Sequence, residues 1–208
     1  MKYCLQNALA AAVLMSAQVT VLAIEEAAYT VRESDDSFEV RDYAPHVVAE
    51  TVVEMSLEEA GDTAFGKLFR YISGDNRTRA EIAMTAPVSQ QRPGEKIQMS
   101  GAVGQQRVEQ GWAVSFMMPA ASTLEALPVP DDPAVTLREV PARRVAVVRY
   151  SGFWSEEGYL RNKQQLESWI ERKGLSIAGD AIWARYNPPI TPWFLRRNEI
   201  LIPVLITD

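Results

Sequence analysis

Residues 40–49 read VRDYAPHVVA, and they can be laid without a gap on residues 137–146, which read LREVPARRVA. In both stretches, residues that favour strands flank a proline, which marks a tight turn. The second strand of each pair continues, through residues 51–53 in one copy and residues 147–150 in the other. The alignment therefore predicts an internal repeat, in which each copy opens with strand, turn and strand.

A helix is predicted after each pair of strands. The first helix begins near Ser56, and Glu59 three residues later completes a capping box. The second begins near Ser155, whose third helical residue is Gly158, so that only the serine itself caps this helix. Each copy thus passes from two strands into a capped helix at a similar distance from its turn.

Two more strands are predicted to complete each copy. A short segment that carries proline follows each helix, at residues 82–88 and 183–189. A final strand then follows, at residues 112–118 and 199–204. Strands, helix and strands in this order predict an α+β fold, with helices packed on a mainly antiparallel sheet.

The mature protein therefore reads as two ββαββ halves. They extend over about residues 29–119 and 134–206, and the linker between them, residues 120–133, is rich in Pro and Asp. We expect the halves to pack about a pseudo-twofold axis.

The first 23 residues are predicted to be a secretory signal peptide and not part of the fold. Lys2 is the only charged residue among the first 24, and residues 8–24 form an apolar run of about 17 residues. Small side chains favour cleavage after Ala23, which would leave residues 24–208 as a single domain in the periplasm or outside the cell. The alternative is an uncleaved membrane anchor over residues 5–24.

Composition narrows the classes of function. The net charge is −6, and an acidic chain argues against nucleic acid as a partner, because that binding rests on neutralised phosphates. The single cysteine, Cys4, leaves with the signal, and the single histidine is His46. These counts exclude ordinary zinc sites and Cys–His nucleophiles. The sequence has no nucleophile elbow, P-loop or dinucleotide-binding motif, so we expect a binding protein and not an enzyme.

The first predicted helix has more apolar surface than packing on one sheet requires. Phe65 and Phe69 widen its apolar arc to roughly 180°, against the roughly 100° of a helix that covers a sheet. Either another loop covers these two rings, or they form one wall of a ligand site. The core stripe consists of Leu57, Ala60, Ala64, Leu68, Tyr71 and Ile72 in the first helix, and of Tyr159, Leu166, Trp169 and Ile170 in the second.

Residues 187–199, NPPITPWFLRRNE, contain three prolines and are predicted to be a surface loop between the last two strands. This loop carries Trp-Phe-Leu at residues 193–195, followed at once by Arg196 and Arg197. Either it folds its apolar residues back onto the core, or it presents them to a flat, apolar and acidic ligand. A pseudo-twofold arrangement would bring the loop to the helix of the first half.

Five blocks of sequence occur in a specific order. They are residues 38–43 (FEVRDY), 82–88 (IAMTAPV), 116–119 (FMMP), 150–154 (YSGFW) and 184–189 (ARYNPP). Together they resemble the SOUL haem-binding family, and the resemblance covers essentially the whole mature chain. It implies a distorted β-barrel made of two β/α halves. It also implies a shallow, mainly apolar site for haem and related tetrapyrroles, between the first helix and the last long loop.

Haem is a flat apolar disc with two carboxylates, so a site for it needs apolar walls and a few cations. On this resemblance, apolar residues of the helix would face one side of the disc and those of the loop would cover the other. A lysine of the helix and the two loop arginines would meet the propionates, for which the planar fork of arginine is suited. The residues so assigned are Phe65, Phe69, Ile72 and Lys67 of the helix, and Trp193, Phe194, Leu195, Arg196 and Arg197 of the loop.

The iron ligand is less well defined. Some members of the family are thought to use a histidine in the first pair of strands, where this chain has Asp42. His46, four residues later, is a candidate haem iron ligand, and the alternative is a solvated turn histidine. Tyr or Met ligands, or no protein ligand at all, also remain open.

The sequence thus favours a periplasmic or secreted protein that binds haem or another porphyrin as a carrier, buffer or scavenger. One alternative is a module of the same fold for another flat hydrophobic molecule. Others are an enzyme that modifies a bound tetrapyrrole, and a partner-binding protein in which the apolar loop is an interface. A membrane is a partner only if the N-terminal segment stays uncleaved.

Overall fold

The computed structural model describes residues 25–91 and 111–205. The predicted signal peptide and its cleavage site therefore lie outside the described residues. The helices are α1 (Leu57–Ile72), α2 (Glu156–Arg172) and the short 3-10 helix η1 (Trp193–Leu195). The strands are β1 (Tyr29–Asp35), β2 (Phe38–Tyr43), β3 (His46–Val53), β4 (Val88–Gln91), β5 (Trp112–Met117), β6 (Thr136–Val140), β7 (Arg143–Tyr150), β8 (Ile182–Arg185) and β9 (Asn198–Pro203).

The strands form one antiparallel sheet in the order β1-β2-β7-β9-β8-β4-β5-β3-β6. The first half contributes β2-β3-α1-β4-β5 and the second half β6-β7-α2-β8-β9. Exchanging the halves reverses the strand order about the β4–β8 pair, so the halves are related by a pseudo-twofold axis. The prediction of an α+β fold with two ββαββ halves is confirmed. The barrel is distorted, because the sheet does not close on itself.

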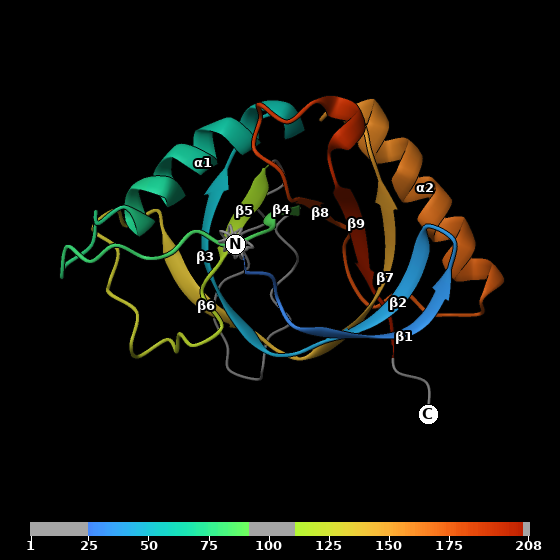
Figure 1. Cartoon of the computed structure of the whole chain (residues 1–208), viewed down its shortest axis with the longest axis horizontal. Coiled ribbons are helices and arrows are strands. Elements are labelled where there is room, and N and C mark those ends of the chain that lie inside the picture. The colour runs from blue at the N-terminus through green and yellow to red at the C-terminus, as the bar shows by residue number, and fades with distance from the viewer. Residues whose placement is uncertain (1–24, 92–110, 206–208) are drawn as a thin grey trace, which may run out of the picture.

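The paired strands that open each repeat differ from a hairpin. β2 pairs with β7, and β3 pairs with β6, so β2 does not pair with β3 and β6 does not pair with β7. Tyr43 lies opposite Arg143, and His46 lies opposite Val140, because the chain continues onward at each proline instead of reversing. In Figure 1, the segment that joins β2 to β3 and the segment that joins β6 to β7 run side by side across the bottom of the view.

Strand β1 was not predicted. It pairs with β2 at the edge of the sheet, and all seven of its residues are exposed. An exposed edge strand has no buried face, so its sequence lacks the alternation of apolar and polar residues that indicates a strand. Among the described residues of the second half, no strand corresponds to β1.

The two helices lie on the outer side of the curved sheet (Figure 1). α1 packs on β3 and β5, and α2 packs on β7 and β9. Ser56 accepts a hydrogen bond from the amide of Glu59, and Ser155 accepts one from Gly158, as the capping pattern predicts. The predicted core stripes are buried in both helices, apart from Leu57, whose side chain is not described. Neither of these helices is long and apolar enough to cross a membrane.

Candidate ligand-binding site

An open cleft of about 400 Å³ lies between α1, the segment that leads into β4, and the loop that follows β8. This volume falls within the range of small-molecule sites. Most of the wall is apolar, and the charged residues in it are Asp62 and Arg185. The lining residues are Gly61, Asp62 and Phe65 of α1; Met84, Thr85, Ala86 and Val88; and Trp154, Arg185, Tyr186, Asn187, Pro188 and Pro189.

Phe65 forms part of the α1 wall. Its ring packs edge-on against Phe116 of β5, with 5.2 Å between the ring centroids, and stacks on Phe69 at 5.8 Å. Phe65 and Phe69 remain 37% and 43% exposed, so no described segment covers them fully. The surplus apolar flank predicted for this helix therefore exists, and Phe65 brings it to the cleft. Phe69, which stacks on Phe65, does not itself line the cleft.

Arg185, the last residue of β8, provides the buried charge of the cleft. Only 8% of its surface is exposed. Its guanidinium carbon lies 5.0 Å from the ring centroid of Trp154 and 5.2 Å from that of Trp183, which are cation–π distances. Burial lowers the pKa of Arg185 to about 10, although the negative charge of Asp62 acts to raise it. The group is therefore still protonated at neutral pH.

The loop after β8 packs against the segment that leads into α2. Trp193 stacks on Phe153, with ring centroids 5.4 Å apart, and its carbonyl accepts a hydrogen bond from the amide of Gly152. These contacts hold η1 against the segment that leads into α2. Residues 187–189 line the cleft, whereas Trp193, Phe194 and Leu195 do not. The three residues are about half exposed or more, and their predicted contact with a ligand remains a prediction.

The two loop arginines point to different partners. Arg196 donates to the carbonyls of Thr191 and Pro189, at 2.8 and 2.7 Å, and its guanidinium lies 4.3 Å from the ring centroid of Trp154. Arg197 instead stacks over Tyr186 at 3.8 Å and forms an ion pair with Glu26. Both cations thus hold the loop in place, and neither lines the cleft.

A fully buried carboxylate, that of Glu199 in β9, lies beneath this loop. Arg41 donates to its two oxygens at 2.8 and 3.1 Å, Arg197 donates at 3.0 Å, and the Tyr186 hydroxyl donates at 2.8 Å. Burial alone would raise the pKa of Glu199. The hydrogen bonds and charge of Arg41, the charge of Arg197 and the hydrogen bond from Tyr186 together hold the pKa below its ordinary value.

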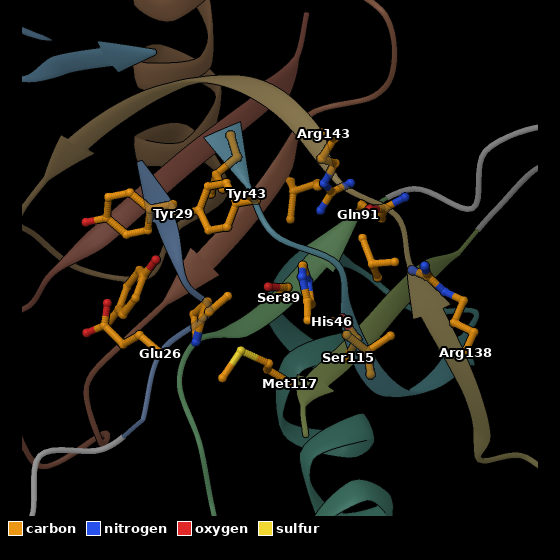
Figure 2. A pocket seen from close by; sticks show the side chains of 17 residues that line it. Glu26, Tyr29, Tyr43, His46, Ser89, Gln91, Ser115, Met117, Arg138 and Arg143 are labelled. Atoms are coloured by element: carbon orange, nitrogen blue, oxygen red, sulfur yellow. The ribbon is translucent and has the colours of Figure 1, made fainter. Parts of the chain in front are cut away.

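The structure places His46 away from the cleft. It lines a separate cavity of about 50 Å³ on the inner face of the sheet, which has room for about one or two water molecules. Figure 2 shows the imidazole beside Ser89 in this cavity. Its Nδ1 donates to the carbonyl of Ala44 at 3.0 Å. Burial lowers the pKa of His46, and the charges of the nearby Arg143 and Arg138 lower it further. The hydrogen bond to Ala44 acts in the opposite direction but does not outweigh them.

Of the other residues assigned from sequence, Ile72 is buried in the core and Lys67 is partly buried on α1, away from the cleft lining. Phe65 is the one cleft residue that was assigned from the sequence, and the missed residues that matter most for the chemistry of the cleft are Arg185 and Trp154. A signal for Arg185 was present, since it is a charge at the end of the otherwise apolar strand Ile182–Arg185.

Within the described residues, no group of His, Cys, Asp and Glu side chains could hold a metal ion.

Comparison with known proteins identifies the family. The model of the SOUL heme-binding protein family matches residues 24–203, which is most of the chain. The chain belongs to the SOUL heme-binding protein family. Human heme-binding protein 2 is 29% identical over 176 residues, which cover 78% of this chain and 80% of the relative. Mouse heme-binding protein 1 is 26% identical over 151 residues, which cover 72% and 74%.

Solved structures with little sequence identity share the fold of this SOUL family member. The C-terminal domain of EcmrR superposes with a TM-score of 0.54 at 12% identity, and covers 86% of this chain and 99% of that domain. A protein described as a hydrolase from Listeria innocua superposes with a TM-score of 0.58 at 11% identity, and covers 84% and 94%. At such identities the likeness shows the fold alone.

Proposed function

We propose that this protein binds haem or a closely related tetrapyrrole in the cleft beside α1, and acts as a carrier, buffer or scavenger. The observation that carries the proposal is the cleft itself: an open, mainly apolar site in a SOUL family member, with one buried cation in its wall. The names of the curated relatives support haem as the ligand. The cleft could also accept another flat hydrophobic molecule, and the titration below distinguishes the two.

The cleft residues fit such a ligand. Phe65, Val88 and Pro188 offer apolar surface to the disc of a tetrapyrrole, and Arg185 offers a cation to a carboxylate. Met84, whose side chain is 43% exposed, also lines the cleft, and a thioether is a known haem ligand. The hydroxyl of Tyr186 is already committed to Glu199, so it is a poorer candidate for the iron.

A haem titration of residues 24–208 tests the proposal. We expect a saturable shift of the Soret absorbance that ends at one haem per chain. The same titration with a flat apolar molecule that carries no carboxylate should give weaker binding. Binding of that molecule without any saturable haem shift would contradict the proposal, and would favour a module for another hydrophobic ligand.

His46→Ala is the internal control of this titration. Since His46 lines the small inner cavity and not the cleft, we expect the haem affinity and the Soret band position of the variant to match those of the wild type. A shifted band with weaker binding would instead identify His46 as the iron ligand. In that case haem would have to bind elsewhere than in the cleft.

We further propose that the protein works in the periplasm or outside the cell. The apolar run at residues 8–24, preceded by a single lysine, supports this compartment. We expect the exported chain to begin at Ile24, with a mass that lacks the first 23 residues. Recovery of the full-length chain in the membrane fraction would favour the alternative of an uncleaved anchor.

A further inference from the structure

The guanidinium of Arg185 is a buried cation without a counter-ion. Among the described residues, none gives it a hydrogen bond or an ion pair, and it lies at cation–π distance from the rings of Trp154 and Trp183. Asp62 also lines the cleft, but it acts on Arg185 only through its charge at longer range. An unpaired buried charge is costly, and proteins therefore seldom keep one without a compensating partner.

The surroundings hold this cation in one place. The indole Nε1 of Trp154 donates to the side-chain oxygen of Asn198 at 2.9 Å, which fixes the ring that Arg185 faces. Arg196 lies against the same ring and is itself held by two backbone carbonyls. A cation held in this way needs little further ordering when it meets a ligand.

Helix α1 leaves space for the guanidinium by means of a glycine. A Cβ atom added at Gly61 would lie 2.1 Å from Nη2 of Arg185. The helix can therefore approach the cation closely only because residue 61 has no side chain. Gly66, one and a half turns later in the same helix, has open space at the same position.

We infer that Arg185 is the carboxylate subsite of the cleft, and that it binds one propionate of the tetrapyrrole while the apolar wall holds the ring. This inference rests on the proposed function. The propionate supplies the counter-ion that the protein lacks. The sequence suggested Arg196 and Arg197 for this role, but Arg196 donates to a backbone carbonyl of the loop and Arg197 donates to Glu199. Because the chain carries a net charge of −6, a dianionic ligand depends on such a local cation.

The test compares two ligands and three proteins. The ligands are haem and its dimethyl ester, in which both carboxylates are neutral; the proteins are the wild type, Arg185→Gln and Arg185→Lys. We expect Arg185→Gln to weaken haem binding about ten- to hundredfold, which is typical of a lost hydrogen-bonded ion pair, and to leave the affinity for the ester unchanged. Arg185→Lys, which keeps the charge, should recover part of the loss.

A pair of helix variants provides a second test that leaves Arg185 in the chain. Gly61→Ala should displace the guanidinium, because the atom in its way is the far end of a flexible side chain, and should weaken haem binding on the order of tenfold. Gly66→Ala should leave binding unchanged. Both variants should remain folded, since alanine favours a helix over glycine.

Removing the charge should also affect the protein without ligand. Because Arg185 is buried without a counter-ion, we expect Arg185→Gln to melt at the same temperature as the wild type or a few degrees higher. A variant that melts normally but has lost haem binding cannot be explained by unfolding.

The outcomes are distinguishable. If Arg185→Gln weakens haem and its ester equally, Arg185 only positions the aromatic rings, and the carboxylate subsite is wrong. If it weakens neither, the subsite is also wrong, while haem binding in the cleft stands. If the wild type binds neither ligand, the proposed function fails and the subsite fails with it.

Discussion

Glu199→Ala is expected to lower the free energy of unfolding by about 3–5 kcal/mol, which is the usual effect of breaking a buried ion pair. The carboxylate is fully buried between Arg41, which is itself almost fully buried, and Arg197. Its removal takes an acceptor from the hydroxyl of Tyr186 and from both cations, which keep only the more exposed carboxylates of Glu39 and Glu26. Chemical denaturation followed by tryptophan fluorescence measures the loss.

Glu50→Ala is the matched control for Glu199→Ala. Glu50 also forms a bidentate pair with an arginine, Arg138, but that pair is partly exposed. Because solvent screens such a pair, we expect a loss of about 1 kcal/mol or less. Equal losses in the two variants would mean that the Glu199 network contributes no more to stability than a surface pair does.

The same network makes stability depend on pH. Because the pKa of Glu199 is lower in the folded than in the unfolded chain, its contribution is fully present above the unfolded value, which is near 4.5. The contribution is lost as the pH falls through the folded pKa, where the folded carboxylate takes up its proton. Acid unfolding of the wild type should therefore depend more steeply on pH below 4.5 than that of Glu199→Gln.

Phe65→Ala is expected to weaken haem binding by about 2 kcal/mol, or about thirtyfold in Kd, because a ring of the cleft wall is lost. Phe65 belongs to the apolar flank predicted for α1, and it also lines the observed cleft. Its contacts with Phe69 and Phe116 also contribute to packing. The titration should therefore be accompanied by a thermal melt, to show that the variant is folded.

Phe194→Ala is the matched control for Phe65→Ala. It removes the same ring from η1, where the side chain is 57% exposed and does not line the cleft. We expect less than a twofold change in Kd, since no contact with the ligand is lost. A loss as large as that of Phe65→Ala would mean that the loop covers the bound ligand, as the sequence suggested.

Much of the fold could be predicted because its signals are local. Ser56 and Ser155 mark the helix starts, and the apolar stripes of both helices indicate which side faces the sheet. The pairing of β2 with β7 could not be predicted from these signals. Apolar alternation shows which face of a strand is buried, but it does not show which strand lies beside it.

The candidate site was only partly predictable for a related reason. The extra apolar surface that Phe65 adds to the first helix can be recognised from the sequence of that helix alone. The burial of Arg185 instead depends on Gly61 of α1 and Trp154 before α2, which are far apart in the sequence. Arg196 and Arg197 look equivalent as neighbours, yet successive side chains of an extended chain point to opposite sides, and only the fold shows what each one meets.

The exchange of strands between the halves also bears on how the chain can fold during synthesis. β2 is made early, but its partner β7 lies roughly a hundred residues later in the chain, and β3 waits almost as long for β6. When the first half has been synthesised, β3, β4 and β5 can pair with one another, but β2 still lacks its partner β7 and β3 still lacks β6. The sheet can be completed only when the second half is available, and pairings between strands so far apart in the sequence predict slow folding.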